Sequence, residues 1–178
     1  MPESAGGTDL EHVALVEAAR GGDRDALARL FDRYAAMVHG IGLARLARAD
    51  ADDLVQDVFL VVMRKIGALR DSAAFGGWLA TIARTRAVDL ARSASRRGDE
   101  FEDLGRDDPD RGDTQRALAA IRALPEAYRE TLILRLVEGM TGPEIAARTG
   151  LTPGSVRVNL HRGMKLLRQS LGIVEQRS

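Results

Sequence analysis

Apolar side chains recur at three- and four-residue steps through most of the chain, which is the spacing of one face of an amphipathic helix. A short pattern of this kind over residues 10–16 ends at Gly21-Gly22, and Asp23 can then cap the start of a longer helix. The stripe that follows predicts one buried helix face, made of Leu27, Leu30, Phe31, Tyr34, Val38 and Ile41.

Two further helices are expected in the first half of the chain. One begins near Ala51 and is apolar on one face as far as Ile66. The other extends from about Phe75 to Arg97 and has Trp78 on the side expected to be buried, and the stretch 67–77 before it is typical of a loop. The helix near Ala51 also has a polar face, which carries Asp52, Asp53, Gln56, Asp57 and Arg64.

The helical pattern stops over residues 98–113, which are acidic and contain glycine and proline. Phe101 and Leu104 are the only large apolar residues there, too few to offset the entropy of ordering the segment. The periodicity returns at Arg116 and continues to Leu171. We therefore predict an all-α fold with two small helical domains, over residues 1–97 and 116–178, joined by an acidic flexible linker over 98–115.

The second half contains the pattern of a helix-turn-helix. Thr141 and Glu144 form a capping-box pair, and Pro143 falls in the first turn, where its missing N–H costs nothing. Gly150 follows at the position of a left-handed helix end, and Pro153 then opens a second helix. A short helix, a tight turn and a second helix predict DNA binding, with the second helix in the major groove.

Composition excludes several classes of protein. The 178 residues include no cysteine, so disulfides, thiolate zinc sites and cysteine nucleophiles are absent. Aromatic residues are only 4%, and alanine, leucine, arginine and glutamate favour helix over sheet. No apolar run reaches the ~20 residues that span a bilayer, and the acidic start does not resemble a signal peptide, so we expect a cytoplasmic protein without membrane insertion.

The net charge of zero conceals alternating blocks. Residues 1–60 carry 6 basic and 11 acidic side chains, and residues 99–116 carry 3 basic and 8 acidic. Residues 61–98 carry 8 basic and 2 acidic side chains, and residues 117–178 carry 9 basic and 5 acidic. The two basic blocks suit a polyanion such as DNA, and they hold the helix-turn-helix and a helix in which aromatic residues precede a run of arginines.

Three segments, in this order and spacing, resemble the extracytoplasmic-function sigma factors, a subfamily of bacterial RNA polymerase sigma factors. Residues 51–66 are similar to the family's polymerase-binding helix, and residues 75–92 to its minus-ten-reading helix. Residues 123–139, with the helix-turn-helix after them, are similar to its minus-thirty-five-reading domain. The resemblance implies a non-enzymatic, cofactor-free protein that binds core RNA polymerase, directs it to promoter DNA and assists promoter melting. It also implies an anti-sigma factor partner and a stress or envelope response.

The resemblance assigns roles to particular residues. The loop at 67–77 would receive a base flipped from the non-template strand, and the acidic linker would follow the polymerase's RNA path. The residues that would dock on core polymerase are Asp53, Gln56, Asp57, Phe59 and Leu60. Those that would contact the minus-ten DNA are Trp78, Arg84, Thr85, Arg86 and Arg92. Those that would contact the minus-thirty-five DNA are Ser155, Arg157, Val158, Asn159, His161, Arg162 and Lys165.

The chain departs from the family pattern at several of these positions. Thr85 stands where an asparagine is usual, which removes a side chain able both to donate to and to accept from a base. Gly163 and Met164 replace the usual alanine and arginine, and Val158 and Asn159 replace serine and arginine. These differences bear on promoter preference rather than on the role itself.

Other functions fit the sequence less well. A free-standing helix-turn-helix regulator would share the second half but would normally add a ligand or phosphoacceptor domain with βα alternation, which this sequence lacks. An enzyme would need a site such as a metal bound by Asp52, Asp53 and Asp57, but this cluster lacks the histidine or spaced oxygen ligands of such sites. An adaptor that mimics a sigma factor would not need arginines suited to DNA in both halves.

Overall fold

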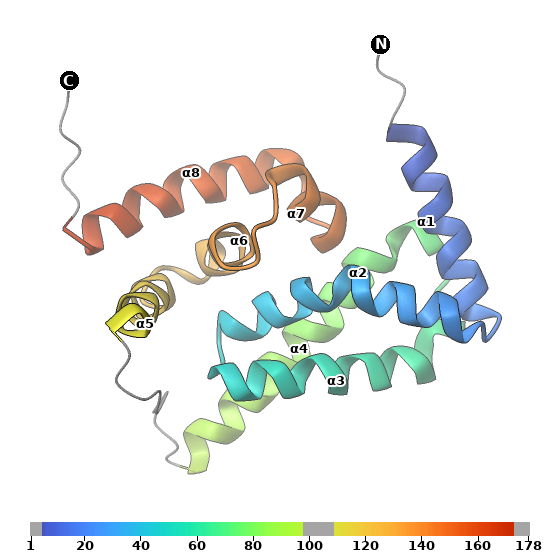
Figure 1. Ribbon diagram of the computed structural model, residues 1–178, viewed down its shortest axis with the longest axis horizontal. Helices are drawn as coiled ribbons and strands as arrows, with labels where there is room; N and C mark the ends of the chain where they lie inside the picture. Colours follow the sequence, from blue (N-terminus) through green and yellow to red (C-terminus); the bar gives the residue numbers. More distant parts are fainter. Residues whose placement is uncertain (1–4, 98–108, 173–178) are drawn as a thin grey trace.

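A computed structural model describes residues 5–97 and 109–172, and every regular element in these ranges is helical (Figure 1). The all-α prediction is confirmed. No helix in these ranges is long and apolar enough to cross a membrane. The helices of the first range are α1 (Ala5–Arg20), α2 (Arg24–Leu43), α3 (Arg48–Lys65) and α4 (Phe75–Arg97), with 3₁₀ turns η1 (Ile66–Ala68) and η2 (Ser72–Ala74) between α3 and α4. Those of the second are α5 (Pro109–Arg122), α6 (Glu126–Leu136), α7 (Gly142–Thr149) and α8 (Pro153–Ser170).

Helices α1 to α4 surround a core of aliphatic side chains with one fully buried aromatic ring, that of Phe75. Asp23 caps α2 as expected, because its carboxylate accepts hydrogen bonds from the backbone N–H groups of Asp25 and Ala26. Of the predicted stripe on α2, the residues Leu30, Tyr34, Val38 and Ile41 are buried and Leu27 is half-buried, whereas Phe31 is 38% exposed. Phe31 lines a shallow hollow between α2 and α3 that is open to solvent, and its ring packs on that of Phe59.

Helix α5 begins at Pro109, inside the segment predicted as a linker, whereas residues 98–108 lie outside the described residues. Proline at the first position of a helix is common because its missing N–H has no partner to lose there. The second core gathers side chains of α5, α6 and α8, among them Leu118, Ile121, Leu132 and Leu167.

The helix-turn-helix has the predicted local structure. Thr141 and Glu144 form a complete capping box at the start of α7. Gly150 ends α7 in the left-handed conformation, with φ of 75°. Thr152 caps α8 by accepting a hydrogen bond from the backbone N–H of Ser155. The turn is therefore fixed by local chemistry at both helix ends.

The two halves of the chain pack against each other, with α6 on α2 and α7 on α4 (Figure 1). Their cores are shared. Leu134, Met140 and Ile145 of the second half belong to the core built around α1 to α4. Likewise, Leu43 and Ala51 of the first half belong to the core built around α5, α6 and α8. In this conformation each half completes the hydrophobic core of the other.

Candidate nucleic-acid and protein interfaces

The outward face of α8 carries every residue predicted to contact duplex DNA. Six of them are exposed and Asn159 is half-buried. The apolar member of the set, Val158, is 44% exposed. The guanidinium, imidazole and ammonium groups on this face are hydrogen-bond donors suited to phosphates and guanine edges. The exposed members are Ser155, Arg157, Val158, His161, Arg162 and Lys165.

The opposite face of α8 holds the helix in place. Val156 and Leu167 are buried, and Gly163 lies where α8 crosses α6. A Cβ atom at Gly163 would be 2.9 Å from Cδ1 of Leu132 and 3.1 Å from Cβ of Tyr128, so the helices approach more closely than a larger residue allows. Gly163 was noted in the sequence only as a departure from the family pattern, and the structure gives it a packing role.

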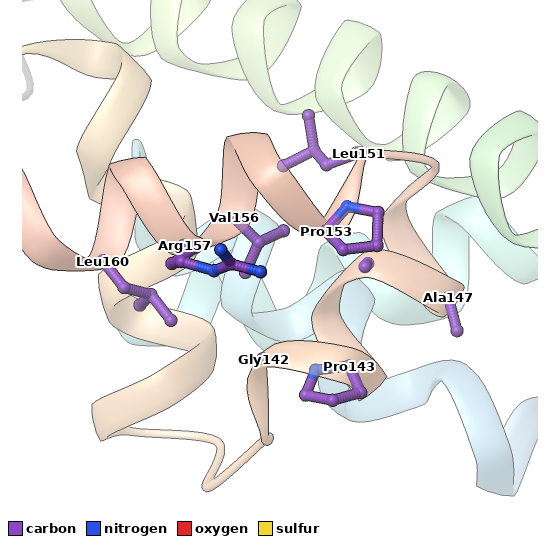
Figure 2. A pocket seen from close by; sticks show the side chains of 9 residues that line it. Gly142, Pro143, Ala147, Leu151, Pro153, Val156, Arg157 and Leu160 are labelled. Carbon is purple, nitrogen blue, oxygen red and sulfur yellow. The ribbon is translucent and has the colours of Figure 1, made fainter.

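An apolar groove of about 690 Å³ lies between α7 and α8 (Figure 2). Pro143 and Ala147 line it from α7, and Pro153, Val156 and Leu160 line it from α8. Figure 2 shows the Arg157 side chain beside Val156 and Pro153, at the edge of this groove. Arg157 therefore borders an apolar surface as well as solvent.

Helix α4 begins with an aromatic cluster. Trp78 is half-buried, as expected, and the centroid of its ring lies 5.8 Å from that of the Phe75 ring. The centroid of the Phe75 ring lies 5.2 Å from that of Tyr34 on α2 and 6.2 Å from that of His12 on α1. Burial raises the pKa of the Tyr34 hydroxyl above its usual value. The sequence did not indicate that Tyr34 and His12 join this cluster, because they come from other helices.

The predicted minus-ten residues on α4 have different surroundings. Thr85, Arg86 and Arg92 are exposed. The Thr85 hydroxyl donates a hydrogen bond of 2.9 Å to the carbonyl of Thr81, one turn earlier. Thr85 therefore satisfies its own donor within the helix and keeps an acceptor toward solvent.

Arg84 is held by an acidic residue of the other half. Its Nε and Nη2 atoms donate hydrogen bonds of 2.9 and 2.6 Å to the two carboxylate oxygens of Glu130 on α6. These bonds raise the pKa of the Arg84 guanidinium above its usual value, and burial opposes the effect. Only 10% of the Glu130 side chain is exposed. A buried glutamate is rare unless it is paired, and here Arg84 is the partner. The sequence did not mark Glu130 as a partner of Arg84.

The polar face of α3 is open to solvent at Asp53, Gln56 and Asp57. Leu60 is 51% exposed on the same helix, and Met63, which no pattern in the sequence marked, is 61% exposed. Phe59 is only 7% exposed and packs on Phe31 with ring centroids 4.8 Å apart. In this conformation Phe59 is buried, whereas the other four predicted residues are exposed on the surface of α3: Asp53, Gln56, Asp57 and Leu60.

Comparison with known proteins identifies the family of this chain. Residues 30–97 match the family model of sigma-70 region 2, and residues 114–167 match that of sigma-70 region 4. The chain is 38% identical over 171 residues to RNA polymerase sigma factor CarQ of Myxococcus xanthus, covering 90% of this chain and 97% of CarQ. It is 34% identical over 172 residues to the ECF RNA polymerase sigma factor RpoE of Cereibacter sphaeroides, covering 89% and 94%. The chain belongs to the extracytoplasmic-function sigma factors.

The fold of this sigma factor is also similar to a solved one. The structure of CnrH, determined in complex with the cytosolic domain of CnrY, matches with a TM-score of 0.66 at 24% identity. The match covers 90% of this chain and 97% of CnrH. Within this sigma factor, α3 and α4 lie in the region 2 match, and α8 as far as Leu167 lies in the region 4 match.

Proposed function

We propose that this sigma factor uses three separate surfaces to bring core RNA polymerase to promoters and to open them. The observation that carries the proposal is the outward face of α8, where basic and polar side chains project from a helix fixed by caps at its start and by close packing at Gly163. A rigid helix with exposed donors, entered through a tight turn, has the geometry required to read the major groove at the minus-thirty-five element.

The α3 surface is proposed to bind core polymerase. Its exposed carboxylates, Asp53 and Asp57, lie beside the exposed apolar side chain of Leu60. A surface that combines charge with an exposed leucine suits a protein partner, since the apolar side chain gains from burial and the charges fix the register. We propose the coiled coil of the polymerase's largest subunit as that partner.

The α4 surface is proposed to hold the minus-ten DNA during melting. Arg86 and Arg92 are exposed for phosphate contacts, and the half-buried Trp78 stands at the start of the helix. Extruding a base from the duplex costs a few kcal/mol, which suits a pocket formed together with the 67–77 loop rather than one side chain. Arg84 would join this surface once Glu130 releases it.

We further propose the setting in which this sigma factor acts. It would work in the cytoplasm, in a stress or envelope response, under the control of an anti-sigma factor. Residues 1–97 would contain the polymerase and minus-ten surfaces, and residues 116–178 the minus-thirty-five surface, with residues 98–115 connecting them.

Transcription in vitro tests the proposal. Bacterial core polymerase would be supplied with a library of promoter-like templates, with and without this sigma factor. We expect start sites that appear only when the sigma factor is present. If the protein binds core polymerase without starting transcription, the proposed function is wrong and an adaptor role is favoured. If it neither binds core nor starts transcription, a free-standing DNA-binding regulator is favoured.

A further inference from the structure

Helix α1 lies outside the region 2 match, which begins at residue 30, but it packs on both 3₁₀ turns between α3 and α4. A carboxylate oxygen of Glu17 on α1 accepts a hydrogen bond from the hydroxyl of Ser72 in η2. Ser72 is only 5% exposed, and burying a hydroxyl group is costly unless it has a hydrogen-bond partner. Glu17 supplies this partner from a position 55 residues away in the sequence.

Glu17 is itself held in place. The Nη1 atom of Arg20, one turn later on α1, donates a hydrogen bond of 2.8 Å to the same carboxylate oxygen. The Ser72 hydroxyl and the Arg20 guanidinium lower the pKa of the Glu17 carboxyl below its usual value. The group is therefore ionised at neutral pH, and an ionised acceptor makes stronger hydrogen bonds than a neutral one.

The loop at 67–77 has further buried contacts on either side of Ser72. Leu69 is 7% exposed, and Phe75 is fully buried with its ring centroid 6.2 Å from that of His12 on α1. Every third residue from Leu69 to Phe75 is therefore buried. The residues between them are exposed to solvent: Arg70, Asp71, Ala73 and Ala74.

The shape of η2 and its place on the protein are set by different bonds. Asp71 caps η2 by accepting a hydrogen bond of 3.0 Å from the backbone N–H of Ala73, which is a local contact. The bond between Glu17 and Ser72 instead joins the turn to another helix. Without Glu17, η2 would keep its cap but lose the polar contact that fixes it against α1.

We propose that Glu17 is a positioning residue for promoter melting, and that its bond to Ser72 holds the loop in the shape that receives the flipped base. The proposal rests on the proposed function, because it takes the loop at 67–77 as the receiver of that base. Capture of an extruded base has to offset the cost of unstacking it. A loop that is ordered before the base arrives loses less conformational entropy on capture than a mobile one.

Variants at both ends of the bond test the proposal. Glu17→Ala removes the acceptor, whereas Glu17→Gln keeps an amide oxygen that can accept a hydrogen bond from the Ser72 hydroxyl. Ser72→Ala removes the donor. Glu11→Ala, at an exposed position on the same helix, is the control for the loss of one carboxylate from α1.

Binding of the complex with core polymerase to a fluorescent non-template oligonucleotide measures capture of the base. The oligonucleotide carries the minus-ten element of a promoter found in the library, either intact or with an abasic site moved through each position in turn. The position at which the abasic site weakens binding most identifies the captured base. If the loop of Glu17→Ala keeps the receiving shape about one tenth of the time, affinity for the intact oligonucleotide falls roughly tenfold.

We expect Glu17→Ala and Ser72→Ala to weaken binding of the intact oligonucleotide but not of the abasic one. The double variant should lose no more than either single variant, because both changes remove the same bond. Glu17→Gln and Glu11→Ala should bind both oligonucleotides as the unchanged protein does. Equal weakening on the intact and abasic oligonucleotides would indicate a general loss of structure and overturn the proposal, as would an unchanged affinity in Glu17→Ala.

Failure of the proposed function has a different signature. In that case core polymerase gives no specific start sites with the unchanged protein, and the proposal falls with the function. Specific start sites, together with the same abasic-site dependence in every variant, would uphold the function and reject Glu17 as a positioning residue. Specific start sites together with an abasic-site dependence that Glu17→Ala loses and Glu17→Gln keeps would support both.

Discussion

The guanidinium of Arg122, at the end of α5, donates a hydrogen bond of 2.9 Å to the carbonyl oxygen of Leu43, the last residue of α2. A second bond of 2.6 Å reaches the carbonyl of Leu46. The last carbonyl groups of a helix have no partner within it, and a cation there also interacts favourably with the helix dipole. Arg122 thus binds carbonyl groups at the carboxyl end of α2, a helix of the other half of the molecule.

Replacing Arg122 by alanine should destabilise the fold. Hydrogen bonds to charged groups contribute about 1.5–3 kcal/mol each, so the two bonds set an upper bound of about 3–6 kcal/mol, and a loss of at least about 1.5 kcal/mol is expected in urea unfolding followed by circular dichroism. The control is Arg116→Ala on the same helix, where the side chain is 80% exposed and pairs with Asp113. That change should cost less than about 1 kcal/mol. Equal losses in the two variants would contradict the role given to Arg122.

Adding a methyl group at Gly163 should also destabilise the protein, although alanine favours a helix. Its Cβ would lie 2.9 Å from Cδ1 of the buried Leu132, and overpacking a core costs about 1–3 kcal/mol. The gain in helix propensity is about 1 kcal/mol, so a net loss is expected for Gly163→Ala. Gly154→Ala is the matched control, because the nearest atom there is 3.9 Å away. The melting temperatures of both variants test this expectation. A higher melting temperature for Gly163→Ala than for the unchanged protein would show that Leu132 moves aside to make room for the methyl group.

The features that the sequence predicted correctly are those set by neighbouring residues. The Asp23 cap, the Thr141–Glu144 capping box and the left-handed Gly150 all follow from residues within one helical turn. Where a helix start has no such signal, the predicted start differs from the observed one. Helix α3 begins at Arg48 rather than near Ala51, because the capping residue, Ala47, makes no side-chain hydrogen bond that could mark the start.

The features that the sequence did not reveal depend on contacts between distant residues. Arg84 and Glu130 are 46 positions apart, and nothing near Glu130 marks it as the partner of an arginine. Helical periodicity placed Phe31 on the buried face of α2, but burial there depends on how far α3 extends over it. The exposed face of α8 was predictable because its inward positions, such as Val156, follow the helical period.

Reversing the charge on the α3 surface should weaken binding to core polymerase. Asp53→Lys and Asp57→Lys change exposed side chains, so the fold should be retained, as circular dichroism can verify. Unlike charges at an interface accelerate association, and like charges oppose it. We expect a weaker affinity for core polymerase in surface plasmon resonance, mainly through a slower association rate. Asp32→Lys on α2, also exposed, is the control. Full retention of binding by both α3 variants would reject this surface as the docking site.

Replacing Arg162 by alanine should weaken recognition of one base in the minus-thirty-five element. The side chain is exposed on α8 and can donate two hydrogen bonds to a guanine edge. Loss of such a contact costs about 1–3 kcal/mol and relaxes the preference at one position, whereas loss of a phosphate contact weakens all promoters alike. Transcription from a randomised promoter library, with core polymerase present, separates these outcomes. An unchanged preference with uniformly lower activity would show that Arg162 contacts the phosphate backbone. Arg29→Ala, an exposed arginine on α2, should leave both quantities unchanged, since α2 lies outside the proposed DNA surfaces.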